Sequence, residues 1–84
     1  MNFTVVWTPS AEQKLADLWI ASSHRQAVTA ASARIDSTLA QRPNSVGTPV
    51  FDTVRSLVIP PLGVEYEVID VDRIVYVLTV WEMP

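Results

Sequence analysis

The fold is decided by residues 64–81, whose sequence is VEYEVIDVDRIVYVLTVW. In the first part of this stretch apolar residues alternate with Glu65 and Glu67, which predicts a β-strand with one buried and one solvent-facing side. Asp70–Arg73 is a polar turn, and Ile74–Trp81 is apolar at nearly every position, as expected of a strand buried on both sides. The stretch therefore predicts an antiparallel β-hairpin.

Two further strands are expected outside this hairpin. Val54–Ile59 shows a similar alternation and is joined to the hairpin by Pro60–Gly63, where prolines prevent ladder pairing. Near the start of the chain, Phe3–Trp7 has the period-two pattern of β-branched and aromatic residues that is typical of a short strand. Asn44–Pro49 is rich in turn-forming residues and is expected to be a loop.

Two helices are predicted between the first strand and that loop. The first begins with Thr8 as its N-cap and Pro9 in the first helical position. Proline is tolerated there because a backbone N–H at that position has no hydrogen-bond partner within the helix. A break at Ser22–His24 separates it from a second helix, which ends at Gln41–Pro43 because the residue before a proline leaves the α region. Residues at helical spacing should pack inward, namely Ala11, Leu15, Leu18, Trp19 and Ser22 in the first helix and Val28, Ala31, Ile35 and Leu39 in the second.

These elements define an α+β fold with the order β-α-α-β-β-β. The two helices are joined by only a few residues and should form an antiparallel hairpin. We expect this hairpin to pack on one face of a mostly antiparallel four-stranded sheet. Because 84 residues can supply only one hydrophobic core, residues 1–84 are expected to form a single domain.

Composition excludes several functional classes. With no cysteine and one histidine, the chain lacks the ligands of the usual zinc sites and a thiol nucleophile, and neither a metal nor a cofactor is expected. The net charge is -3, and residues 43–84 hold six of the nine acidic but only two of the six basic side chains. Since Lys and Arg supply most nucleic-acid affinity, we expect no autonomous binding to nucleic acid. No apolar run approaches the roughly 18 residues of a membrane span, so a cytoplasmic protein without membrane contact is expected.

Few side chains are candidates for chemistry or binding. Glu65 and Glu67 lie about 7 Å apart on one strand face, close enough for carboxylates to cooperate, although acids at such positions also solubilise an exposed sheet face. Arg55 is a charged residue in an otherwise apolar strand, where it either forms a salt bridge with Asp52 or a strand partner, or has a functional role. Trp81 is expected to be partly exposed and useful at an interface.

The order of these segments resembles the RelE/ParE superfamily of toxins from type II toxin–antitoxin systems. The resemblance extends over essentially the whole chain and is carried by Val5–Glu12, Leu39–Pro43, Val54–Leu57, Gly63–Val68 and Ile74–Trp81. It implies a small toxin that a cognate antitoxin neutralises by wrapping around it. RelE-like members cut mRNA in the ribosomal A site with Arg, Lys and Tyr side chains, whereas ParE-like members poison DNA gyrase without that set.

The resemblance also shows where this chain departs from the RelE-like nucleases. Arg55 matches their basic residue on the strand that follows the helices, but Gly63 stands where a further basic residue is expected. The tail carries Glu82 where those enzymes carry a base. Cleavage of a phosphodiester requires a base, an acid and positive charge at the phosphate, and one arginine does not supply all three.

Three functional hypotheses remain open. In the first, the chain is a toxin that binds proteins, namely its antitoxin and a target such as DNA gyrase or the ribosome, with contacts at Trp81, Arg55, Glu65 and Glu67. In the second, it is a divergent ribosome-dependent mRNA endonuclease in which Arg55 steadies the phosphate and Tyr66 donates or accepts a proton. In the third, it is a degenerate, non-toxic interaction module.

Overall fold

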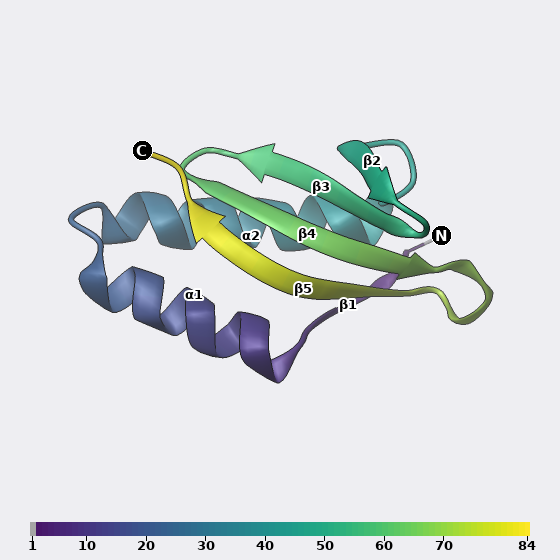
Figure 1. Ribbon diagram of the computed structural model, residues 1–84, viewed down its shortest axis with the longest axis horizontal. Coiled ribbons are helices and arrows are strands. Elements are labelled where there is room, and N and C mark those ends of the chain that lie inside the picture. Colours follow the sequence, from purple (N-terminus) through teal and green to yellow (C-terminus); the bar gives the residue numbers. More distant parts are fainter. Residues whose placement is uncertain (1) are drawn as a thin grey trace.

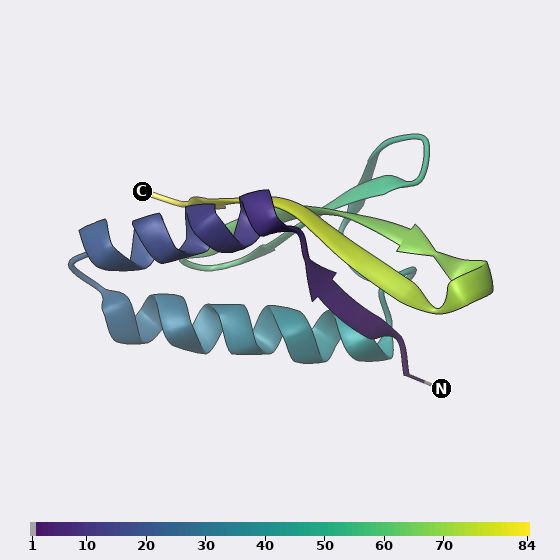
Figure 2. The same ribbon diagram turned by 90° about the horizontal axis from the view of Figure 1, so that it is seen from below.

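The computed structural model describes residues 2–84, which form a helical hairpin and a five-stranded sheet (Figure 1). Both helices lie on one face of the sheet (Figure 2). The predicted α+β class and helical hairpin are confirmed. Along the chain the elements are β1 (Thr4–Trp7), α1 (Pro9–Ala21), α2 (Arg25–Gln41), β2 (Thr48–Phe51), β3 (Val54–Ile59), β4 (Leu62–Ile69), the 3-10 helix η1 (Asp70–Asp72) and β5 (Ile74–Glu82).

The strands form one sheet in the order β1-β5-β4-β3-β2. β1 and β5 are parallel, with Thr4 opposite Ile74, and every other neighbouring pair is antiparallel. This arrangement confirms the mostly antiparallel sheet. The turn between β4 and β5 consists of η1 and Arg73, whose φ of 57° lies in the left-handed region.

The expectation of four strands is wrong by one, because the edge strand β2 begins within the expected loop Asn44–Pro49 and continues to Phe51. All four residues of β2 are exposed, and Pro49 cannot donate a ladder hydrogen bond. A short edge strand that buries no side chain in the core leaves no alternating pattern in the sequence, so turn-forming residues dominate the prediction there.

The core lies between the inner face of the sheet and α2. Val28, Ala31, Ile35 and Leu39 are all buried, which confirms the inward stripe predicted for the second helix. Their partners are the inward side chains of the two central strands, namely Leu62, Val64, Tyr66, Val68, Val75, Val77 and Val80.

α1 begins as predicted but packs less tightly than predicted. Thr8 is its N-cap, and the Thr8 Oγ1 accepts a hydrogen bond of 3.2 Å from the Ala11 N–H. Of the expected inward stripe only Ala11 is buried, and Leu15 and Leu18 are partly buried. The expectation for Trp19 is wrong, because this side chain is 43% exposed in the space between the two helices.

The prediction that β5 is buried on both sides is also wrong. Val75, Val77 and Val80 are buried against the helices, but Trp81 and its neighbours on the outer side are only half-buried. Neither helix covers this outer face of the sheet (Figure 1). Within residues 2–84, no helix is both long enough and apolar enough to cross a membrane.

Candidate functional site

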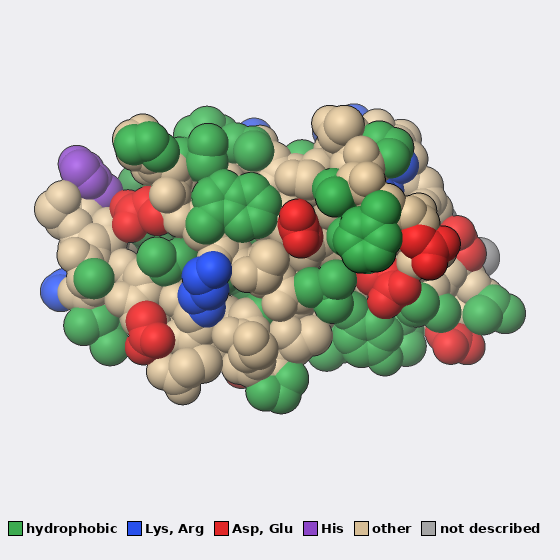
Figure 3. Space-filling model, in the orientation of Figure 1, with side chains coloured by type: hydrophobic (Ala, Val, Ile, Leu, Met, Phe, Trp, Pro, Cys, Tyr) green, Lys and Arg blue, Asp and Glu red, His purple; other side chains and the backbone are tan. Residues whose placement is uncertain are grey.

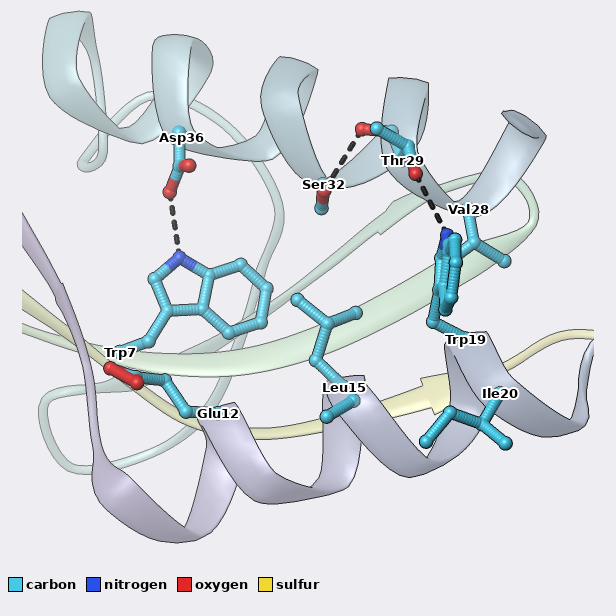
Figure 4. A pocket seen from close by; sticks show the side chains of 10 residues that line it. Trp7, Glu12, Leu15, Trp19, Ile20, Val28, Thr29, Ser32 and Asp36 are labelled. Carbon is cyan, nitrogen blue, oxygen red and sulfur yellow. Dashed lines mark hydrogen bonds between the residues drawn. The ribbon is translucent and has the colours of Figure 1, made fainter. Parts of the chain in front are cut away.

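A groove of about 580 Å³ lies between α1 and α2 (Figure 4). The end of β1 and the facing sides of both helices line it, and most of the lining is apolar. Its residues are Trp7, Glu12, Leu15, Ala16, Trp19, Ile20, Val28, Thr29, Ser32 and Asp36. Since α1 and α2 run antiparallel, Trp7, Glu12 and Asp36 mark one end of the groove, and Trp19, Ile20 and Val28 mark the other (Figure 4).

Polar side chains of α2 hold an indole at each end of the groove. The Trp7 Nε1–H donates to Asp36 Oδ1 at 2.6 Å, and the Trp19 Nε1–H donates to Thr29 Oγ1 at 3.1 Å (Figure 4). Both indole N–H groups are therefore satisfied, and ring surface remains available for apolar contact. Leu15 lies between the two indoles (Figure 4).

This groove leaves much apolar surface in contact with water. Trp19 is 43% exposed and Ile20 is 63% exposed, although both are large apolar residues on adjacent positions. Contiguous apolar surface of this kind, with a polar rim, is typical of a binding groove for an apolar partner. The arrangement is suited to binding a polypeptide segment and offers no group of residues arranged for acid–base chemistry.

Arg55 and Tyr66 lie opposite each other on β3 and β4, on the inner face of the sheet. The Tyr66 hydroxyl lies within hydrogen-bond distance of two carbonyl oxygens, those of Pro43 at 2.8 Å and Val46 at 3.0 Å. The Arg55 Nε and Nη2 donate to the same Val46 carbonyl at 3.1 and 3.0 Å, and Nη2 also reaches the Gly47 carbonyl at 3.4 Å. The two side chains together hold the segment from Pro43 to Gly47 against the sheet.

This position bears on the proton-transfer role expected of Tyr66. The residue is fully buried, and burial raises the pKa of its hydroxyl above the ordinary 10.0, although the nearby Arg55 guanidinium opposes that shift. A hydroxyl with these properties stays protonated at neutral pH. To meet a substrate it would have to leave both carbonyl groups, so its catalytic role stays a prediction that the geometry does not favour.

The arginine side chains do not gather into one basic basin. Arg55 lines a hollow of about 160 Å³ together with Asp52 and Asp70, and no other arginine contributes to that hollow. Arg73 lies over the Phe3 ring, 4.6 Å from its centroid, and Arg34 and Arg42 are exposed. Arg55 donates to backbone carbonyls instead of pairing with Asp52.

The outer face of the sheet carries the other predicted contact residues. Glu65 and Glu67 are half-buried there, and Glu67 Oε2 accepts a 2.6 Å hydrogen bond from Thr53 Oγ1. The Trp81 indole lies directly over Gly63, where a Cβ atom would overlap the ring. Its Nε1–H points to the Met83 sulfur at 3.1 Å. Figure 3 shows acidic and hydrophobic side chains on this face with a basic side chain among them, and Lys14 Nζ lies 3.3 Å from the Thr79 hydroxyl.

Sequence reasoning missed the groove. It placed Trp19 in the buried stripe, did not single out Asp36, and favoured core or edge packing over a binding role for Trp7. The available signal was the neighbouring pair Trp19 and Ile20, because the two adjacent residues of a helix point about 100° apart and cannot both lie in one inward stripe. Among residues 2–84 no three His, Cys, Asp or Glu side chains come together as a metal site would require.

This chain has a helical hairpin on one face of a sheet whose first and last strands pair in parallel, and it shares a RelE/ParE-like fold with solved structures of toxin–antitoxin systems. It is similar over 98% of its length to a chain of the toxin–antitoxin complex RelBE2 from Mycobacterium tuberculosis, with a TM-score of 0.82, 21% identity and 92% of that chain covered.

Two further solved structures have the same fold. A chain of the chromosomal ParDE system from P. aeruginosa matches with a TM-score of 0.75 and 16% identity, and the match covers 98% of this chain and 97% of the ParDE chain. The isolated E. coli RelE toxin matches with a TM-score of 0.57 and 13% identity, covering 98% and 85%. No family model matches the sequence, and no curated protein matches it.

Proposed function

We propose that this protein is the toxin of a type II toxin–antitoxin system and acts by binding other proteins. The observation that carries the proposal is the open apolar groove between α1 and α2, on a fold similar to chains of the RelBE2 and ParDE systems. The antitoxin is the first partner. The second is a cellular target of the gyrase or translation type.

The groove is the surface that an antitoxin segment would cover. Burying Trp19 and Ile20, now 43% and 63% exposed, removes apolar area from water, and each Å² contributes about 25 cal/mol. A domain of 84 residues is only modestly stable alone, so a partner that binds the folded state alone raises its melting temperature.

The outer face of the sheet is the proposed surface for the second partner. Trp81 is its half-buried aromatic residue, and the carboxylates of Glu65 and Glu67 outnumber the ammonium of Lys14, which reaches Thr79 on the same face. Carboxylates repel the phosphates of RNA and attract basic protein surfaces, so this face favours a protein target over a nucleic acid. Arg55 contributes to this surface indirectly, because it holds the backbone of Val46 and Gly47 next to the sheet edge.

The test is induction of the protein in a bacterial host, with and without the product of the adjacent gene. The proposal predicts growth arrest on induction and rescue by co-expression, together with a stable complex on size-exclusion chromatography. Trp19→Ser should weaken that complex, and Trp81→Ser, a matched loss of an indole on the opposite face, should leave it intact. Harmless expression of the folded protein contradicts the toxin assignment and favours the degenerate interaction module.

The endonuclease hypothesis has its own test. Mapping of ribosome-bound mRNA ends after induction would show cleavage in the wild type and its loss in Arg55→Ala and Tyr66→Phe, provided that both variants remain folded at the assay temperature. We expect no cleavage that depends on these residues, because Tyr66 is buried against two carbonyl groups. Cleavage abolished in a folded Tyr66→Phe variant would instead establish the catalytic role.

A further inference from the structure

Charged residues of opposite sign lie at the two ends of the groove between α1 and α2, with Glu12 and Asp36 in its lining and Arg25 in an adjoining hollow. At the Trp7 end the lining includes the carboxylates of Glu12 and Asp36, the only charged residues among those that line the groove. Asp36 uses one oxygen, Oδ1, to accept the Trp7 indole, which leaves its other oxygen for a further donor. The groove therefore has a distinctly acidic end.

Arg25 lies at the opposite end. Its guanidinium stacks on Trp19, 5.0 Å from the ring centroid, and lines a second hollow of about 290 Å³ that shares Trp19 and Thr29 with the groove. The Arg25 Nε donates to the Trp19 carbonyl at 3.0 Å and Nη2 donates to the Ile20 carbonyl at 2.6 Å. These contacts fix a positive charge beside the apolar end of the groove.

The walls of the groove favour a helical occupant. Both walls are helices, whose backbone N–H and C=O groups are already paired along their length. An extended segment lying there would find no backbone partners, whereas a helix brings its own hydrogen bonds and needs to offer only side chains. The lining runs from Glu12 to Ile20 and from Val28 to Asp36, which corresponds to about 12 Å or two helical turns.

A helix also has a direction that the two ends can distinguish. Its N-terminus carries a partial positive charge and its C-terminus a partial negative charge. Because α1 and α2 are antiparallel, their own dipoles oppose each other, and the side chains of Glu12, Asp36 and Arg25 decide which orientation is favoured.

We propose that the groove binds a partner helix in one direction, with its N-terminal end at Glu12 and Asp36 and its C-terminal end at Arg25. The partner helix has Lys or Arg in its first turn, Asp or Glu in its last turn, and apolar side chains at i, i+3 or i+4, and i+7 that contact Trp7, Leu15 and Trp19. The inference rests on the proposed function only in taking the groove as the partner-binding surface.

The test uses a displayed library of 16-residue peptides with a helix-forming framework and randomised end charges, selected on the full-length protein. We expect the enriched pool to carry basic residues in the first turn and acidic residues in the last. The peptide with exchanged end charges forms the more stable free helix, because those charges suit its own dipole. Both peptides are therefore stapled to equal helix content, and the enriched one should then bind about fivefold more tightly. Titration should shift the indole N–H signals of Trp7 and Trp19 and leave that of Trp81 in place.

Two charge variants show whether the groove residues set the direction. Glu12→Lys, an exposed residue of the acidic end, should reduce the fivefold ratio to about one. Asp17→Lys, which makes the same charge change on α1 but outside the groove lining, should preserve the ratio. Both variants are compared only after circular dichroism shows native helix content.

Three results with peptides would overturn the inference. They are a pool without a charge bias or with the reverse bias, a ratio that Glu12→Lys leaves unchanged, and selected peptides that leave the Trp7 and Trp19 signals unshifted. A concentration-dependent shift of the Trp19 signal without peptide would point to a second copy of the chain as the occupant and would also overturn it. None of these readouts depends on growth arrest. If the protein binds helices in one direction but does not stop growth, the toxin function is contradicted and the inference stands.

Discussion

Replacing Tyr66 with phenylalanine removes one oxygen atom and separates the structural role of this residue from a catalytic one. The hydroxyl is buried and meets the carbonyls of Pro43 and Val46, which belong to the segment between α2 and β2. If its function is to hold that segment, Tyr66→Phe lowers the free energy of unfolding. If its function is proton transfer, the same change abolishes cleavage with little effect on stability.

The magnitude follows from which acceptors lose their partner. Val46 keeps the two Arg55 hydrogen bonds at 3.1 and 3.0 Å, so its carbonyl stays satisfied in the variant. Pro43 is buried and loses the 2.8 Å contact from the hydroxyl. One lost hydrogen bond and one buried carbonyl left without this partner together cost about 1–2 kcal/mol. For a domain of this size the melting temperature falls by about 5–15 °C.

The assay is urea unfolding followed by circular dichroism, with thermal melts as a second measurement. Tyr76→Phe serves as the matched control, because Tyr76 lies on the outer face of the sheet and its substitution should change the free energy of unfolding by less than about 0.5 kcal/mol. A loss below about 0.5 kcal/mol for Tyr66→Phe, with an unchanged m-value, would refute the structural role.

Further predictions concern three other features. Burial raises the pKa of Tyr66 above 10.0, so the hydroxyl's contribution to stability is complete below about pH 10 and is lost as pH rises through the higher folded-state pKa. Between pH 9 and 11 the free energy of unfolding in urea should therefore fall more for the wild type than for Tyr66→Phe. Equal losses in the two proteins contradict this prediction. Gly63→Ala should cost about 1–3 kcal/mol and redshift tryptophan fluorescence, because a Cβ displaces the Trp81 indole; an unchanged spectrum argues against that packing. Asp36→Ala should cost about 1 kcal/mol by releasing the Trp7 indole, which faster exchange of its N–H in NMR would report and unchanged exchange would contradict.

The fold was largely predictable because its core elements bury regular patterns. The stripe Val28–Leu39 and the alternation of Val64–Val68 each match one buried face, and Thr8 with Pro9 defines a helix start by local chemistry alone. Thr48–Phe51 escaped prediction because its pairing with β3 is a backbone interaction at an exposed edge. Such pairing depends on the neighbouring strand and leaves no side-chain signature.

The candidate site was less predictable because it depends on contacts between distant segments. Trp7 and Asp36 are 29 positions apart, and their hydrogen bond requires β1 and α2 to be placed by the sheet. Helical spacing placed Trp19 in the inward stripe of α1, but spacing does not tell whether the neighbouring helix lies close enough to cover that side chain, and Trp19 is 43% exposed. Tyr66 was singled out by resemblance, and only the structure shows the carbonyls around its hydroxyl.

The place of β5 between β1 and β4 has a consequence for synthesis of the protein. Translation produces Thr4 about 70 residues before Ile74, the residue it faces in the sheet. Until residues 74–82 emerge from the exit tunnel, β1 has no neighbour and β4 has an open edge, so the nascent polypeptide holds at most a helical hairpin beside an incomplete sheet. Pairing of β1 with the rest of the sheet thus begins only after residues 74–82 have left the tunnel.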